Sequence, residues 1–529
     1  MKKMPSLSDL VRGEVHVSPP AFDPSRVKWR EELPAALAMF VIAVPLCLGI
    51  ALASDVPLSA GIIAGIVGGL VVGALSGTPL MVSGPAAGLT VIVVAGVESV
   101  GSFESLLLAV VLAGVMQLGL AAMRAGIVGT FFPSAVVRGM ISAIGILLVL
   151  KQIPHAVGYD TDAMGDESFL QPNAENTVTG LFGALTHVEW GAVLVAVVAL
   201  GVLYGWSRLS RGWHSIVPAA VVAVLSGIAV NALLQGYAPT LALTATHLVS
   251  LPVADGMGER LAQFHTPDFS TIGSAAVWRL AVIIAIVASL ETLLTVEATE
   301  RLDPYKRVPD VNRELFAQAA GNITSGLLGG LPLTGVMIRT AAGIDAGGRT
   351  NRATMLHGVL LALAAFVAPR WVNLIPLAAV AAVLIALGWR LASPDVARAE
   401  FRFGRAHAVP FAITVLAILV TDLLIGLIVG LAVGVFYVLL DQYRSVPFTE
   451  VSPPGAVLRR LQLQRHVTYL HRPALVTEFQ EFTPGSRVEL DGRQTERIDP
   501  DVLSLIHDYH ESAATRGVDL RLVGIPPRP

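Results

Sequence analysis

Long apolar runs recur along most of the chain, from about residue 33 to residue 441. Hydrophobic residues make up 54% of the 529 residues and charged residues 14%, whereas soluble domains are about one quarter charged. This pattern predicts a polytopic α-helical membrane protein. We expect fourteen membrane segments, at residues 33–54, 57–76, 84–97, 104–123, 130–150, 189–207, 215–234, 277–297, 312–330, 333–345, 353–369, 371–390, 408–421 and 423–441.

The charges between these segments predict the orientation of the chain. Arg124 and Arg349 fall between segments on one side, whereas the charged residues of the loops 151–188 and 236–274 on the other side are mainly Asp and Glu. Loops on the cytoplasmic face of a membrane are enriched in Lys and Arg. Both termini are therefore expected to be cytoplasmic, with residues 1–30 forming a polar N-terminal arm.

One apolar stretch, residues 329–350, is too short and too broken to cross a membrane. Its apolar part, residues 333–344, would extend only about 18 Å as a helix, against a hydrocarbon core of about 30 Å. Pro332 and several glycines interrupt the stretch, and Arg339 lies within its apolar part. Such a segment predicts a half-helix whose N-terminus stops near the midplane, where free N–H groups attract anions. The alternative is a re-entrant loop whose arginine reaches the cytoplasmic headgroups.

A weak internal repeat supports the half-helix. Residues 77–96, GTPLMVSGPAAGLTVIVVAG, and residues 330–347, GLPLTGVMIRTAAGIDAG, both begin with Gly-x-Pro-Leu and continue into a short apolar helix. The two copies lie seven segments apart, and because seven is odd the second copy enters the membrane inverted. The repeat therefore predicts two half-helices whose N-termini point at each other across the midplane.

An acidic residue, Glu291, falls near the membrane midplane in the eighth segment. It follows Arg279 by twelve residues, which is about 18 Å along a helix. Thr295 lies one turn further on the same helix face. A carboxylate at this depth must be protonated, paired with Arg339, or bound to a cation such as Na⁺. A Glu291–Arg339 ion pair that only joins two segments is the structural alternative.

After Arg444 the composition becomes that of a soluble domain. Apolar strands alternate with amphipathic stretches in the order strand, helix, strand, helix, strand, which predicts a small cytosolic α/β unit at residues 443–529. His507, Asp508 and His510 invite a metal interpretation. We interpret them instead as a solvated helix face, because no further ligand has the spacing of a zinc site.

Several of these stretches resemble the SulP family of anion transporters, the sulfate permease or solute carrier 26 group. The resemblance rests on GLPLTGVMIRTAAGIDAGGRT, SLETLLT at 289–295, VIAVPLCLGIALASDVPLSAG at 41–61 and SGPAAGLT at 83–90, and it spans residues 31–442. It implies a 7+7 inverted repeat in which a core domain, segments 1–4 and 8–11, moves like an elevator against a gate domain, segments 5–7 and 12–14. It also implies that the C-terminal unit is a short STAS-like domain and that the protein is a homodimer.

The resemblance also implies the site residues. It places the anion between the third and tenth segments, beside the first, at Pro85, Ala86, Ala87, Gly88, Ile338, Arg339, Thr340, Pro45, Leu46 and Cys47. Three positions depart from common family patterns: Leu46 replaces Gln, Ile338 replaces Ser, and Ala86 replaces a bulkier aromatic. Glu291 and Thr295 match the spacing of the acid and Thr that bind Na⁺ in cyanobacterial bicarbonate transporters, while in other bacterial members an acid here accompanies proton coupling.

These observations predict secondary active transport of bicarbonate or sulfate across the inner membrane of a bacterium, coupled to Na⁺ or H⁺. The alternatives are transport of dicarboxylates or other organic anions, a nucleobase transporter of the same architecture, and a membrane sensor that transports nothing. Because the sequence contains no catalytic triad and no nucleotide-binding loop, we expect no enzymatic activity. We also expect no cofactor and no nucleic-acid partner.

Overall fold

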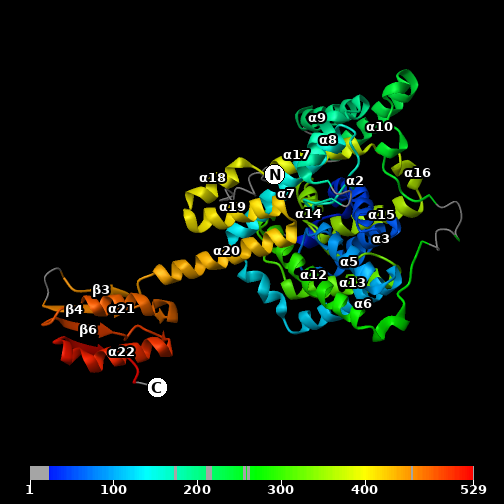
Figure 1. The fold of residues 1–529 in the computed structure, drawn as a ribbon. Coiled ribbons are helices and arrows are strands. Elements are labelled where there is room, and N and C mark those ends of the chain that lie inside the picture. The colour runs from blue at the N-terminus through cyan, green and yellow to red at the C-terminus, as the bar shows by residue number, and fades with distance from the viewer. Residues whose placement is uncertain are drawn as a thin grey trace. The chain divides into compact units, whose positions relative to one another are not determined.

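The computed structural model describes residues 23–171, 175–209, 217–253, 258, 263–453 and 457–527. Most of the predicted N-terminal arm, residues 1–22, lies outside the described residues. The chain divides into two compact units between Leu431 and Ala432 (Figure 1).

The first unit is almost entirely helical. Its helices are α2 (Trp29–Ala53), α3 (Leu58–Val67), α4 (Gly73–Leu75), α5 (Thr90–Val100), α6 (Phe103–Ala122), α7 (Ser134–Ala156), α8 (Thr177–Thr186), α9 (Trp190–Leu209), α10 (Ala219–Tyr237), α12 (Ala275–Leu302), α13 (Val311–Leu328), α14 (Met337–Asp345), α15 (Asn351–Phe366), α16 (Pro369–Val372), α17 (Leu377–Leu391), α18 (Pro394–Arg402), α19 (Arg405–Val420) and the start of α20 (Leu423–Arg444). The two short strands of this unit are β1 (Ser83–Pro85) and β2 (Leu333–Gly335).

A helix overlaps each of the fourteen predicted segments. Within the described residues, eight helical stretches are individually long and apolar enough to cross a membrane. A ninth span arises if α8 and α9, which are bent by 111° at the break between them, count as one. The multi-pass helical architecture is thus present, whereas the count of fourteen spans and the 7+7 repeat stay predictions.

Buried carboxylates fix the helix ends of this unit. Glu314 on α13 accepts hydrogen bonds from the backbone N–H groups of Gly77 and Thr78, each 3.1 Å long. Glu32 on α2 accepts from the Thr350 hydroxyl at 2.9 Å. Both carboxylates are fully buried, and a buried charge is costly unless hydrogen bonds satisfy it. These bonds therefore hold together segments that are far apart in the sequence.

The two copies of the repeat meet in the middle of the unit. β1 and β2 pair antiparallel, with Ser83 opposite Gly335 and Pro85 opposite Leu333. Each strand leads into a short helix: α14 follows β2, and a 3₁₀ turn (Ala87–Leu89) followed by α5 follows β1. Asn322 on α13 donates to the Leu333 carbonyl at 3.1 Å and accepts from the Leu333 N–H at 2.8 Å. Residues 77–96 and 330–347 therefore each contain a short helix that follows one strand of this antiparallel pair.

The second compact unit begins at Ala432, inside α20, and the domain boundary at residue 443 stays a prediction. Its four-stranded sheet has the order β3-β4-β6-β8, in which β3 is antiparallel to β4 and the other pairs are parallel. The elements are β3 (Phe448–Glu450), β4 (Leu458–Leu463), β5 (His466–Val467), α21 (Arg472–Glu481), β6 (Arg487–Asp491), β7 (Arg497–Ile498), α22 (Pro500–Ala513) and β8 (Asp519–Val523).

The predicted order of strands and helices is found in this unit, with β3, β5 and β7 in addition. Leu475 and Ile506, one from each helix, are buried in its core together with Leu461 and Val488 from the sheet. The Nε2 of His507 lies 2.8 Å from the Pro526 carbonyl oxygen.

Candidate functional site

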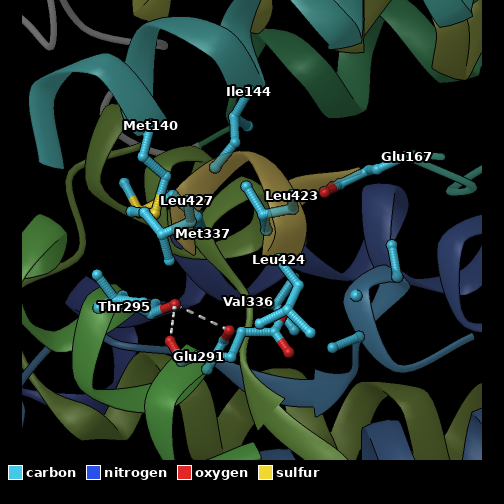
Figure 2. Close-up of a pocket in the computed structure, with 15 residues that line it drawn as sticks. Met140, Ile144, Glu167, Glu291, Thr295, Val336, Met337, Leu423, Leu424 and Leu427 are labelled. Carbon is cyan, nitrogen blue, oxygen red and sulfur yellow. Dashed lines mark hydrogen bonds between the residues drawn. The ribbon is translucent and has the colours of Figure 1, made fainter. Parts of the chain in front are cut away.

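A small cavity lies where the first residues of the two half-helices meet α7, α12 and α20 (Figure 2). It has a volume of about 30 Å³, which is room for about two water molecules. Its lining residues are Ala86, Ala87, Gly88, Met140, Ile144, Glu167, Glu291, Leu294, Thr295, Gly335, Val336, Met337, Leu423, Leu424 and Leu427. Most of this wall is apolar, and the ionisable side chains in it are two carboxylates.

The half-helices bring backbone N–H groups to this cavity. The first N–H groups of a helix have no acceptor inside the helix and lie at its positive dipole end. Ala87 and Gly88 precede α5, and Met337 begins α14. The residue before α14, Val336, is fixed by its N–H, which donates to the Val82 carbonyl at 2.7 Å. Two positive helix ends therefore converge on one small, mainly apolar space.

Glu291 and Thr295 face this space from α12. The Thr295 hydroxyl lies 3.0 Å from the Glu291 carbonyl oxygen and 3.1 Å from the Gly335 carbonyl oxygen (Figure 2). Glu291 Oε2 is buried and has no hydrogen-bond partner among the described residues. The carboxylate also lies against Gly88, where an added Cβ would be 3.1 Å from Glu291 Oε1. An unpartnered carboxylate oxygen and a threonine hydroxyl thus lie together beside the helix ends.

Arg339 occupies a different place from the one the ion-pair alternative requires. Its side chain is fully buried, and its three guanidinium nitrogens have no hydrogen-bond partner among the described residues. It lies close to Cys47 and His357 and against Gly84 of β1. Arg339 is not part of the cavity wall and is not paired with Glu291. The guanidinium of Arg339 therefore lies against β1 and outside the cavity wall.

The remaining predicted anion residues are divided between three places. Leu46 and Ile338 line a neighbouring cavity of about 10 Å³ that also includes Lys151. The Thr340 hydroxyl accepts from the Val82 N–H at 3.0 Å and donates to the Val336 carbonyl at 2.8 Å, so its donor is used inside the fold. Pro45 and Cys47 are buried in α2, and Pro85 is the last residue of β1.

Sequence reasoning missed one polar residue of this site. Glu167 comes from the segment between α7 and α8, and its carboxylate points into the cavity (Figure 2). The sequence places Glu167 among the acids of a loop outside the membrane, and no motif marks it. Only the path of the chain brings it to the half-helices. The apolar wall from α7 and α20, including Met140 and Leu423, was not predicted either.

Crossed half-helices that point their N-termini into a buried space define a class of membrane transport protein. A family model supports this assignment: the Sulfate permease family matches residues 29–437. The chain therefore belongs to the sulfate permease family, the SulP/SLC26 group of sulfate and bicarbonate anion transporters.

Individual relatives are similar over most of their length. The chain is 25% identical over 412 residues to the putative sulfate transporter YvdB of Bacillus subtilis (strain 168), which covers 78% of this chain and 74% of that protein. It is 25% identical over 422 residues to the bicarbonate transporter BicA of Picosynechococcus sp. (strain ATCC 27264 / PCC 7002 / PR-6), covering 77% and 69% respectively.

Solved structures share the fold. The transmembrane domain of a cyanobacterial bicarbonate transporter BicA matches with a TM-score of 0.53 and 22% identity, covering 77% of this chain and 97% of that domain. Murine Slc26a9, an anion transporter solved in the inward-facing state, matches with a TM-score of 0.67 and 15% identity, covering 100% of this chain and 93% of that one.

Proposed function

We propose that this protein is a secondary active transporter that carries a small oxyanion, bicarbonate or sulfate, across the membrane. The observation that supports this proposal is the cavity in which two half-helix N-termini meet the carboxylate of Glu291. Relatives named as sulfate and bicarbonate transporters point to the same class of substrate. A space with room for about two waters suits a small inorganic ion better than a dicarboxylate or a nucleobase.

In this proposal the anion binds to the free N–H groups at the starts of α5 and α14. Arg339, which lies against β1, stabilises the bound anion at a distance, since a buried cation lowers the energy of a nearby anion even without contact. Pro85, Ala86, Ala87 and Gly88 shape the approach to these N–H groups. Leu46 and Ile338 form apolar walls of the neighbouring cavity.

Glu291 requires a cation to accompany the anion. Two negative charges in one small cavity repel each other, so neutralising Glu291 raises the affinity for the anion, and the anion raises the affinity for the cation by the same factor. Na⁺ suits the free Oε2 of Glu291 with the Thr295 oxygen as ligands. A proton on Glu291 would neutralise the same charge. The two ions are alternative coupling partners for one site.

The movement proposed for transport is an elevator. The core would contain α2 to α6 and α12 to α15, and the gate would contain α7 to α10 and α17 to α20. The packing supports this division, because α6 lies along α12 and α13, whereas α7 lies along α17 and α19. The cavity lies between the two groups, bounded by α12 and α14 on one side and by α7 and α20 on the other.

The topology and assembly belong to the same proposal. The bias of Lys and Arg towards one set of loops supports cytoplasmic termini in a bacterial inner membrane. The C-terminal α/β unit is proposed to be a STAS-like domain, and the protein a homodimer.

Uptake into proteoliposomes tests the function. Purified protein should accumulate radiolabelled bicarbonate or sulfate, and unlabelled competitors should rank these anions above chloride, dicarboxylates and nucleobases. A folded, reconstituted protein that moves none of these tracers would contradict transport and favour a sensor.

Glu291→Gln and Thr295→Val distinguish the coupling ions. With Na⁺ coupling, uptake at constant pH follows the Na⁺ gradient, and Thr295→Val weakens the apparent Na⁺ affinity by roughly tenfold, as the loss of a supporting ligand does. With H⁺ coupling, uptake follows external acid regardless of Na⁺, and Glu291→Gln removes the pH dependence while exchange continues. Thr299→Val is the matched control, because Thr299 is also buried on α12 but does not line the cavity. If Glu291→Gln leaves uptake and both ion dependences unchanged, both coupling models are wrong.

A further inference from the structure

The segment between α7 and α8 separates two cavities of very different size. On one side lies the small anion cavity, which Glu167 lines. On the other side lies a larger space of about 510 Å³, which we call the acidic vestibule; its acidic side chains are Asp55, Glu98 and Asp166. Asp166 and Glu167 are consecutive residues, so a single turn of chain forms the partition. In the proposed topology, with both termini cytoplasmic, this vestibule lies on the extracytoplasmic side.

Ion pairs and hydrogen bonds hold the segment in place from several directions. The Nζ atom of Lys151 on α7 lies 2.9 Å from Asp162 Oδ2 and 3.8 Å from Asp166 Oδ2. Further along, the Phe169 N–H donates to the Thr421 carbonyl, just before α20, at 2.7 Å. The partners of the segment thus belong to the elements that we assign to the gate.

The same segment packs directly on α2, which belongs to the proposed core. Gly49 faces the Met164 carbonyl so closely that any side chain at position 49 would overlap it. Gly165 has a φ of +105°, and a Cβ there would lie 3.3 Å from the Leu46 Cα. Glycine is required at position 165 both for this backbone conformation and for the close approach. The segment therefore closes the space between gate and core beside the anion cavity.

Glu167 faces charged groups from three neighbouring elements. Lys151 of α7 and Asp166 of its own segment are close enough to act on it. Glu291 of α12 lines the same cavity, and Asp422, just before α20, also acts on Glu291. The cation of α14, Arg339, lies against Gly84 of β1 and is not part of the cavity wall. The local balance at Glu167 is therefore negative.

We infer that Glu167 is a carboxylate gate between the acidic vestibule and the anion cavity, and that its negative charge opposes entry of the anion from that side. The inference rests on the proposed transport of an anion through this cavity. An anion that leaves the vestibule must pass the partition formed by Asp166 and Glu167. Neutralising Glu167 removes one of the two carboxylates from its path, and displacing the segment opens the path itself. Glu167 is thus a positioning and selectivity residue distinct from Glu291.

The environment of Glu167 places its titration in the physiological range. Burial, with a smaller contribution from the neighbouring Asp166, raises the pKa of the Glu167 carboxyl to about 7. The charge that opposes entry is therefore largely absent at an external pH near 6 and largely present near 8. If only the neutral form admits the anion, the competent fraction falls about tenfold over that range.

Sulfate-for-sulfate exchange in proteoliposomes, at equal pH on both sides, tests the gate, because sulfate keeps its charge across this pH range and no H⁺ gradient drives the exchange. Wild-type exchange should fall about tenfold between pH values of about 6 and about 8. Glu167→Gln should give a flat profile, whereas Glu167→Asp should keep the fall because it keeps a titrating charge. Glu98→Gln is the matched control, since Glu98 lines the vestibule but not the anion cavity. A Glu167→Gln profile identical to that of the wild type would overturn the inference while leaving the transport function intact.

A second measurement needs no transport. Ala87→Cys places a thiol in the anion cavity, and a membrane-impermeant thiol reagent is added from the vestibule side; the parent protein corrects for Cys47, which is fully buried. Combining Glu167→Gln with Ala87→Cys should speed labelling by a negatively charged reagent severalfold. Leu52→Cys, in the vestibule wall, should label equally fast with and without Glu167→Gln. Equal labelling of position 87 in both backgrounds would overturn the gate even if the protein moved no anion.

Discussion

At the scale of single residues, Arg339 has the most unusual environment. It is fully buried, its nitrogens have no hydrogen-bond partner among the described residues, and the imidazole nitrogens of the neighbouring His357 have none either. An unpaired buried charge costs several kcal/mol. In the proposed function, a bound anion nearby would offset part of this cost.

Arg339→Ala should therefore weaken anion binding without preventing insertion. At an effective dielectric constant of about 20, the attraction between a buried cation and a nearby anion that it does not touch amounts to about 1–2 kcal/mol. The loss of the Arg339 charge should therefore lower the affinity for the anion about tenfold. Arg339→Lys keeps the charge and should lose less. Binding can be measured by concentration-dependent uptake, with size-exclusion chromatography as the folding control. Wild-type affinity in a well-folded Arg339→Ala protein would remove Arg339 from the site.

A second residue-scale feature lies where the end of α7 meets the loops that follow α7 and α10. Asp160 accepts from two histidines, with Oδ1 lying 2.6 Å from His155 Nδ1 and Oδ2 lying 2.6 Å from His247 Nδ1. The hydrogen bond from His247 to Asp160 raises the pKa of His247 above its usual 6.5. Burial alone would raise the pKa of Asp160, but the hydrogen bonds from both histidines lower it below 3.8 overall.

This arrangement predicts how stability depends on pH. The raised pKa of His247 means that its contribution is fully present below about pH 6.5 and is lost as pH rises through the folded-state pKa. The lowered pKa of Asp160 adds a contribution that is lost only in strong acid. The wild type should therefore lose a few degrees of melting temperature between about pH 6 and about pH 9 that His247→Gln does not lose. His510→Gln, an exposed histidine, is the control; if His247→Gln shows the wild-type slope, the ion pair does not stabilise the fold.

At the scale of elements, the two half-helices depend on a polar network and on an ion pair. Asn322 satisfies the backbone of β2, and Gln117 on α6 accepts from the Asn322 amide at 2.8 Å. At the far end of α14, Asp345 pairs with Arg390 on α17. This pair lies in the wall of a cavity of about 240 Å³ that also borders α2 and α10. It connects the proposed core to the proposed gate.

Breaking this ion pair should loosen the contact between α14 and α17. A partly exposed pair contributes about 0–1 kcal/mol, so Arg390→Ala should change the exposure of the nearby cavity by no more than about fivefold. Labelling of Ala386→Cys, whose side chain lines that cavity, measures the exposure. The double variant Asp345→Arg with Arg390→Asp should restore the original rate. Identical labelling in all three proteins would show that the pair does not hold core and gate together.

At the scale of the whole molecule, the two compact units suggest separate roles in assembly. The second unit, at the C-terminus, has its own core, in which Leu461, Val488 and Ile506 are almost completely buried. Most soluble homo-oligomers are two-fold symmetric, so a second copy of the C-terminal unit could pair with the first through one self-complementary surface. We therefore expect a homodimer that depends on the C-terminal unit.

Deleting the chain after Arg444 should weaken the dimer more than it damages the anion site. Mass measurement in nanodiscs should show mainly dimers for the full chain and a larger monomer fraction for the shortened chain. Sulfate affinity per protomer should change less than about threefold, because the cavity residues end at Leu427. A full-length protein that stays monomeric at all concentrations would contradict the assembly.

The sequence by itself determined the membrane class, the short helices that follow β1 and β2, and the order of strands and helices in the C-terminal unit. These depend on local patterns: the length of apolar runs, Gly and Pro at the helix starts, and the alternation of strands with amphipathic helices. The position of Glu291 followed from counting residues along one helix from Arg279. Resemblance to a family then supplied the candidate anion residues of these two segments. Most of them lie in or beside the paired strands β1 and β2.

Only the tertiary structure decided what faces the cavity. The side of α14 from which Arg339 projects, the use of the Thr340 hydroxyl by the Val82 N–H, and the arrival of Glu167 from a distant loop depend on how segments far apart in sequence pack together. No periodicity within one segment contains that information. The strength of charge interactions in a low-dielectric interior depends on the distances that this packing sets. Glu167, which the sequence places in a polar loop, therefore lies beside Glu291 as the second carboxylate of the cavity.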